Sequence, residues 1–205
     1  MKVLLVEDHA VVREGVRKLL LEQFNAEIVE AADGAQALQS FRAERPDIVV
    51  LDLNLTGTGG LEVLRRMLVL DARAKILVFT THSEPVYAAR AMQSGAKGYV
   101  SKSAPADELL SAVKRIVEGG QYIDKDVASR LAIGQLSTND PFQKLSAREL
   151  EILRLLGNGA SLSDIAEKLG VAYKTVANTC THIKEKLGVE RTADLIRLSV
   201  ENLRG

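Results

Sequence analysis

Short apolar runs alternate with longer amphipathic segments over the first 118 residues. The runs are rich in Val, Ile and Leu and lie at Lys2–Val6, Ala26–Ala31, Ile48–Leu51, Lys75–Thr80 and Gly98–Val100. The segments between them carry apolar residues at helical spacing, as in Leu61, Val63, Leu64 and Leu68. Strands that alternate with helices form parallel sheets through right-handed crossovers, so the pattern predicts a doubly wound α/β domain with a five-stranded parallel sheet.

The pattern changes after residue 120. One more short helix is predicted over 124–133, and the stretch GQLSTNDPFQK then crowds Gly, Asn, Asp and Pro together, as linkers do. Only helices are predicted beyond it, at 146–156, 162–169, 174–187 and 192–203. Ser146 with Glu149 three residues later forms a capping box at the first of them. We therefore expect a second, all-α domain at the C-terminal end.

Charge and cysteine content exclude few functions for this protein. The 205 residues carry 27 basic and 27 acidic side chains, and the part from Lys144 onward has ten basic against eight acidic residues. That mild excess permits nucleic-acid binding without requiring it. The single cysteine, Cys180, rules out an intramolecular disulfide and indicates a reducing compartment. Glu7 and Asp8 follow too few apolar residues for a signal peptide, so we expect a cytoplasmic protein.

Polar residues stand at the ends of the predicted strands. Glu7 and Asp8 follow the first run and Asp52 the third, while Thr80 ends the fourth and Lys102 trails the fifth. In a doubly wound sheet, ligands bind outside the carboxyl ends of the strands, where these side chains would meet. Acids that repel one another in a crevice suit a hard divalent cation such as Mg²⁺, which favours phosphate. Asp52 could then attack phosphorus and become an acyl phosphate.

Three other interpretations of Asp52 compete with this one. DLNLTG matches the start of a calcium-binding EF-hand loop, but Val63 stands where a bidentate Glu is needed. A phosphatase of the haloacid dehalogenase type requires a second aspartate as general acid, and Asn54 occupies that position. Helix capping and ordinary packing could explain each polar residue alone. Their common position at strand ends favours a shared site.

Residues 1–120 resemble the receiver domain of two-component response regulators, a flavodoxin-like fold. The resemblance rests on Glu7-Asp8, Asp52, Gly57, Thr80, Gly98-Tyr99 and Lys102. It implies that Asp52 is the phosphoacceptor for a histidine kinase and that Thr80 and Lys102 contact the phosphoryl group. It also implies that Glu7, Asp8, Asp52 and the Asn54 backbone carbonyl hold Mg²⁺. Tyr99 would turn inward on phosphorylation, although simple packing at the sheet edge is the alternative. Thr56 departs from the family, which usually has proline there.

The C-terminal helices contain a pair of helix-turn-helix length, 162–169 and 174–187, joined by the turn Gly170 to Tyr173. On the second helix, Val176, Cys180, Ile183 and Leu187 form an apolar stripe. The opposite face offers Lys174, Thr175, Ala177, Asn178, Thr181 and Lys184. Asn can read adenine, Thr can touch base edges, and Lys suits phosphates. A merely solvated helix face is the alternative interpretation.

Residues 144–205 resemble the LuxR-type DNA-binding domain, through KLSARELEIL, GASLSDIAEKLGVAYKTVANT and HIKEKLGV. With a linker over 121–143, the whole chain is similar to response regulators of the NarL/FixJ type. The resemblance implies a homodimer on DNA, paired through the last helix, whose apolar residues could equally be intradomain core. Ala177 and Thr179 stand where the family commonly has lysine and histidine. Weak DNA binding by the monomer is therefore expected.

The expected function is that of a phosphorylation-controlled transcription regulator. It would accept a phosphoryl group on Asp52 and bind promoter DNA through its helix-turn-helix. It would not be an enzyme, because the only reactions expected are its own phosphorylation and dephosphorylation. A phosphatase built on the same fold, or a regulator that binds protein through its C-terminal domain, are the alternatives. DNA binding that is sensitive to salt would separate the first interpretation from the last.

Overall fold

The computed structural model describes residues 1–135 and 141–203. By its internal contacts the chain divides into two compact units, residues 1–131 and 132–205. Residues 136–140 belong to the predicted linker and lie outside the described residues. The helices of the described residues do not combine the length and apolar character that crossing a membrane requires.

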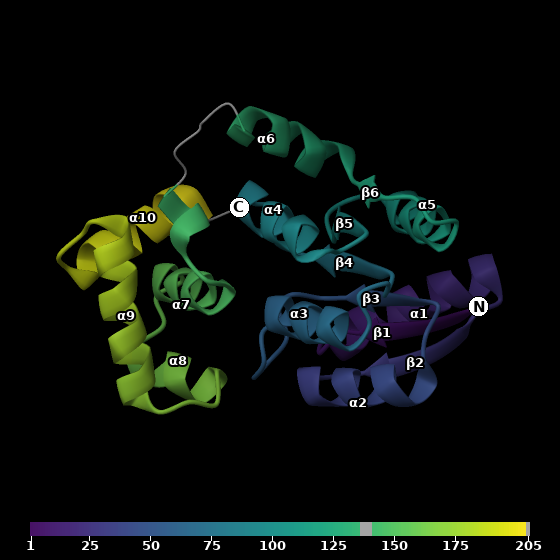
Figure 1. Cartoon of the computed structure of the whole chain (residues 1–205), viewed down its shortest axis with the longest axis horizontal. Helices are drawn as coiled ribbons and strands as arrows, with labels where there is room; N and C mark the ends of the chain where they lie inside the picture. The colour runs from purple at the N-terminus through teal and green to yellow at the C-terminus, as the bar shows by residue number, and fades with distance from the viewer. Residues whose placement is uncertain (136–140, 204–205) are drawn as a thin grey trace. The chain divides into compact units, whose positions relative to one another are not determined.

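The N-terminal part alternates strands and helices, as the sequence predicts (Figure 1). Its elements are β1 (Lys2–Val6), α1 (Ala10–Phe24), β2 (Glu27–Ala31), α2 (Gly34–Glu44), β3 (Ile48–Leu51), α3 (Gly60–Leu70), β4 (Ile76–Thr80), α4 (Pro85–Ser94), β5 (Gly98–Ser101), α5 (Ala106–Val117), β6 (Tyr122–Ile123) and α6 (Lys125–Gln135). The strands pair in parallel in the order β2-β1-β3-β4-β5-β6. The doubly wound fold is thus confirmed.

Helices cover both faces of this sheet (Figure 1). On one face, apolar side chains of α1 and α5 pack against β1, β3, β4 and β5 in a core that includes Val16, Leu20, Val113, Ile116, Val3 and Ile48. Both faces of the central strands are covered, so β3 is buried at all four of its residues. Continuous apolar runs are what such strands require, because no residue of theirs faces water.

The prediction of five strands was wrong by one. Strand β6 pairs in parallel with β5, with Tyr122 opposite Gly98 and Ile123 opposite Tyr99. A strand of only two residues has no period to detect, and its neighbours Gly119 and Gly120 suggest a loop. Its formation depends on the edge of β5, which lies more than 20 residues away in sequence. The short helix predicted beyond it is α6.

The C-terminal part is helical, as predicted. It contains a 3₁₀ turn, Pro141–Lys144, and the helices α7 (Ala147–Gly157), α8 (Leu162–Lys168), α9 (Tyr173–Leu187) and α10 (Thr192–Leu203). The predicted capping box is present, since the Ser146 side chain accepts from the N–H of Glu149 and the Glu149 side chain accepts from the N–H of Ser146. Ser161 and Asp164 form a second one at α8. Capping boxes satisfy backbone donors that a helix start leaves free.

Helix α10 packs on α7 through a close contact. A Cβ placed on Gly157 would collide with the side chain of Ser199, so the helices approach closely only because position 157 lacks one. Leu195 is fully buried, whereas Ile196 is 38% exposed. One side of α10 is therefore intradomain core, and Ile196 stays available for another contact.

Candidate functional site

The acids predicted to meet at the sheet edge do meet there. Glu7 and Asp52 directly follow β1 and β3, which are paired neighbours, and both are almost fully buried. Lys102 follows β5, and its Nζ lies 2.7 Å from Asp52 Oδ2 and 2.5 Å from Glu7 Oε2. The ammonium thus bridges acids from different strands. This arrangement follows from the parallel sheet, because the carboxyl ends of its strands share one edge.

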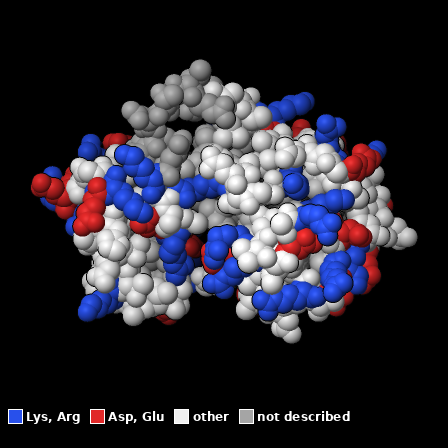
Figure 2. Space-filling view, in the orientation of Figure 1, with Lys and Arg blue, Asp and Glu red and all other residues white. Residues whose placement is uncertain are grey.

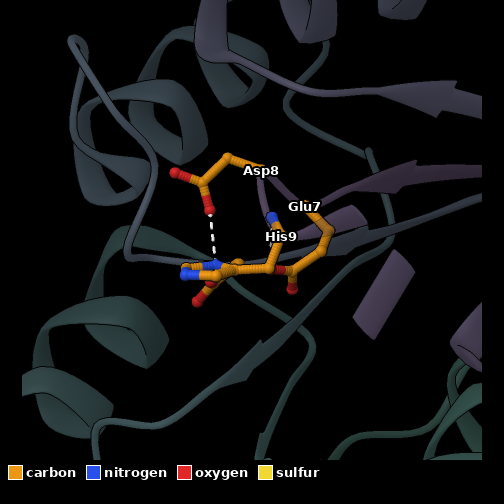
Figure 3. A group of neighbouring side chains, drawn as sticks. Glu7, Asp8 and His9 are labelled. Carbon is orange, nitrogen blue, oxygen red and sulfur yellow. Dashed lines mark hydrogen bonds and ion pairs between the residues drawn. The ribbon is translucent and has the colours of Figure 1, made fainter. Parts of the chain in front are cut away.

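His9 lies beside these acids, although the sequence did not lead us to predict it as a site residue. Its Nδ1 lies 2.8 Å from Asp8 Oδ1 and 3.2 Å from Glu7 Oε1, and its N–H donates to the same Glu7 oxygen (Figure 3). Potential ligand atoms of Glu7, Asp8, His9 and Asp52 all lie within 4.8 Å of one another. The sequence signal was the position of His9 directly after the acid pair. A lone histidine there also suits a helix start, so the signal was weak.

The loop after Asp52 is fixed by hydrogen bonds to the same acids. The Asn54 N–H donates to Asp52 Oδ1 over 3.1 Å, and the Asn54 side chain donates to Thr81. The Thr56 N–H donates to Asp8 Oδ2 over 3.1 Å. Proline has no N–H, so the threonine supplies a contact to Asp8 that the usual family residue could not make. A Cβ at position 60 would collide with the backbone of Asp52 and Leu53. Because Gly60 has none, the start of α3 can lie against the loop.

Thr80 and Tyr99 are both fully buried beside this site. The Thr80 carbonyl accepts from the Lys102 N–H, and its hydroxyl accepts from the His82 N–H. The Tyr99 hydroxyl donates to the His82 carbonyl over 2.8 Å, and burial raises the pKa of Tyr99 well above its ordinary value. Tyr99 therefore lies inward in this structure. Whether phosphorylation moves it stays a prediction.

Helix α9 presents the face that the sequence predicts. Val176, Cys180 and Ile183 are buried, and Leu187 at the end of the stripe is half-buried. Burial raises the pKa of the Cys180 thiol, which suits a core residue better than a reactive one. On the opposite side, Lys174, Thr175, Asn178 and Thr181 are exposed, and Ala177 and Lys184 are half-buried. These six residues are called the α9 face below.

The comparisons with known proteins agree with this geometry. Residues 3–114 match the family described as response regulator receiver domain, and residues 143–199 match bacterial regulatory proteins of the luxR family. The oxygen regulatory protein NreC of Staphylococcus carnosus is 38% identical over 211 residues, which cover 98% of this chain and 97% of that protein. The response regulator UvrY of Escherichia coli CFT073 is 36% identical over 204 residues, covering 98% and 94%.

A solved complex of the two-component response regulator RcsB with DNA is similar along the whole chain. It shares 25% identity and a TM-score of 0.62, covering 96% of each chain. The present chain belongs to the two-component response regulators of the NarL/FixJ type, which join a receiver domain to a LuxR-type DNA-binding domain. It is a DNA-binding transcription regulator controlled by phosphorylation.

Proposed function

We propose that Asp52 is the phosphoacceptor and that a histidine kinase is the donor. The observation that carries the proposal is the bridge from Lys102 to Asp52 and Glu7. A buried carboxylate held against an ammonium presents its oxygen as a nucleophile beside a positive charge. The same ammonium lies where it can contact the oxygens of an incoming phosphoryl group.

The donor set fits Mg²⁺. Glu7, Asp8 and Asp52 offer carboxylates within 4.8 Å of one another, and Lys102 balances only part of their charge. Together with the backbone carbonyl of Asn54, they would hold the ion. Carboxylate and carbonyl oxygens are the ligands that Mg²⁺ prefers in proteins. When bound, the ion would neutralise charge on the phosphoryl oxygens.

In the transfer step, an Asp52 carboxylate oxygen forms a bond to phosphorus while the P–N bond of the phosphohistidine breaks, and its electron pair returns to the imidazole nitrogen. Lys102 stabilises the charge on the phosphoryl oxygens, and the Thr80 hydroxyl donates a hydrogen bond to one of them after a local shift. We infer that this reaction and the later hydrolysis of the acyl phosphate, which releases inorganic phosphate and regenerates the Asp52 carboxylate, are the only chemistry of the protein. It turns over no separate substrate.

The signal leaves through the α9 face. We infer that Asn178 reads base edges in the major groove and that Thr175, Ala177 and Thr181 contact neighbouring bases, while Lys174 and Lys184 contact phosphates. The domain would bind promoter DNA as a homodimer, as LuxR-type family membership suggests, and Ile196 on α10 is a residue available for pairing. A regulator of this kind acts in the cytoplasm.

Acetyl phosphate with Mg²⁺ tests the acceptor. Wild-type protein should gain the mass of one phosphoryl group, and Asp52→Asn should gain none. Asp107→Asn removes an exposed acid of the same domain and should behave as wild type. Modification of Asp52→Asn to the wild-type extent would refute the assignment.

DNA selected from random sequence tests the output. Phosphorylated protein should enrich paired half-sites, and Lys174→Ala combined with Asn178→Ala should abolish the enrichment. Lys144→Ala removes one positive charge outside α9 and should leave the selected sequence unchanged. If the double variant selects the same sequence, the α9 face does not read DNA.

A further inference from the structure

A buried aspartate joins helix α6 to the strand that carries Lys102. Asp124 is 2% exposed and lies between β6 and α6. Its Oδ1 accepts from the N–H of Val127 over 2.9 Å, in the first turn of α6. Its Oδ2 accepts from the N–H of Ser101 over 2.7 Å, at the end of β5. The two oxygens of one side chain therefore bind two different elements.

Helix capping explains only the first of these bonds. Elsewhere in this chain Ser146 and Ser161 cap their helices through the same bond to the third residue, each with a single hydroxyl. A serine would suffice at position 124 if the cap were the only requirement. The second carboxylate oxygen is thus in excess of what the helix start needs, and it is bound to Ser101.

Ser101 immediately precedes Lys102, whose ammonium bridges Asp52 and Glu7. The Lys102 N–H donates to the Thr80 carbonyl over 2.7 Å, and the Asp124 N–H donates to the Tyr99 carbonyl over 3.0 Å. The backbone from residue 99 to residue 102 is therefore held between β4 on one side and β6 with α6 on the other. A shift of the Lys102 backbone would therefore also act on the bond from Ser101 to Asp124.

A second contact links α6 to the other loop at the site. Arg130 Nη1 donates to Ser83 Oγ over 3.3 Å. Ser83 follows His82, whose carbonyl accepts from the Tyr99 hydroxyl. The end of β5 thus reaches the residue before α6, and the loop after β4 reaches α6 itself, each through a hydrogen bond.

We propose that Asp124 is a positioning residue that couples the phosphorylation state of Asp52 to helix α6. The inference rests on the proposed function of Asp52. In the unmodified protein Lys102 binds Asp52 and Glu7 directly. A phosphoryl group on Asp52 places the acceptor oxygens further out, so Lys102 moves, Ser101 moves with it, and the bond to Asp124 transmits the shift to the start of α6. This helix leads the chain out of the receiver domain.

Hydrogen exchange of the full chain tests the coupling. Peptides covering 125–135 are followed with and without acetyl phosphate and Mg²⁺, while intact mass reports phosphorylation of Asp52. In wild-type protein, phosphorylation should change the exchange rate of the first turns of α6 by about fivefold, the size of one lost cap. Asp126→Asn changes an exposed acid of the same first turn and should respond as wild type.

Asp124→Ser separates the coupling from the cap. Serine keeps the bond to Val127 but is too short to reach Ser101 as well. The unmodified variant should therefore protect α6 within about twofold of wild type, and phosphorylation should no longer change that protection. Asp124→Asn offers only one acceptor oxygen and should also lose the response.

Two results would overturn the coupling. Wild-type protein that gains the phosphoryl mass without any change in α6 refutes it and leaves the proposed function intact; this arm needs no variant to fold. An Asp124→Ser variant that folds and responds as wild type refutes it too. If wild-type protein gains no phosphoryl mass, the proposed function of Asp52 and the coupling fail together.

Discussion

At the level of the single residue, the proposed function gives Lys102 two opposed roles. Its ammonium lies within 2.7 Å of the acids that would bind Mg²⁺, so it competes with the ion for their charge. It is also the group placed to contact a phosphoryl oxygen. A substitution at this position should therefore separate ion binding from phosphorylation.

Lys102→Ala should bind Mg²⁺ about tenfold more tightly, because one positive charge leaves a cluster of carboxylates. The same variant should be phosphorylated more slowly, since the phosphoryl oxygens lose a charged partner. Calorimetric titration with Mg²⁺ and the rate of mass gain from acetyl phosphate measure the two effects. Lys97→Ala, which removes a lysine just before β5, serves as the control. A parallel loss of both properties would contradict the assigned geometry.

Helix α7 places two glutamates in opposite electrostatic settings. Burial raises the pKa of Glu149, but hydrogen bonds from Lys186 and Ser146 outweigh it, so the pKa lies below its ordinary value of 4.5. Burial also raises the pKa of Glu151, and Arg148 offsets this only in part, so that pKa lies above 4.5. One carboxylate thus favours the folded state when ionised, and the other disfavours it.

The two glutamates should give opposite responses to acid. The stabilisation from Glu149 is complete above pH 4.5 and is lost as the pH falls through its lower folded pKa. The cost of ionised Glu151 is relieved as the pH falls through its raised pKa. Glu149→Gln should cost about 1 kcal/mol at pH 7, whereas Glu151→Gln should cost nothing or stabilise. Urea unfolding at pH 7 and pH 4, monitored by hydrogen exchange in α7, measures the sign of the stability change in each variant.

The packing of α10 on α7 depends on the missing Cβ of Gly157. Gly157→Ala should destabilise the C-terminal domain by about 1–3 kcal/mol, because the new methyl group meets Ser199. Ser199→Gly should restore most of the loss when combined with it. Thermal unfolding of the two single variants and the double variant measures this coupling. Strictly additive effects would show that the two residues do not touch.

Elements with a clear period were predictable, and single contacts were not. The strands β1 to β5 and the helices α7 to α10 follow from apolar spacing and caps, and so does the meeting of Glu7, Asp52 and Lys102 at one edge. Strand β6 escaped because it depends on a distant partner. The bonds from Thr56 to Asp8 and from Ser101 to Asp124 use backbone N–H groups. Almost every residue has a backbone N–H, so the identity of a residue does not reveal which N–H groups make such bonds.

At the scale of the whole molecule, the balance of charge affects how strongly the protein is attracted to DNA. Net charge is zero at pH 7, and basic and acidic side chains intermingle on the face drawn in Figure 2. We therefore expect weak long-range attraction to DNA, and binding that depends on few phosphate contacts and on pairing of two copies. Phosphorylation could control such a protein effectively by pairing two copies, because we expect a single copy to have little affinity of its own.

Ala177→Lys should add a positive charge that can reach a phosphate next to the bases that Ala177 is proposed to contact. Affinity for selected DNA should rise, and the slope of log K against log salt should steepen by about one for each bound copy. Ala177→Gln adds length without charge and should leave the slope unchanged. Fluorescence anisotropy over a range of salt concentrations measures both. An unchanged slope in the lysine variant would place residue 177 away from phosphates.

Strand β6 bears on how the receiver can be isolated. The family match ends at residue 114, but the N–H groups of Tyr122 and Asp124 donate to carbonyls of residues 97 and 99. A fragment that keeps α5 but ends at residue 118 would uncover β5 at the side of the sheet, and uncovered strands pair with strands of other molecules. Such a fragment should self-associate, whereas one that ends at residue 131 should stay monomeric.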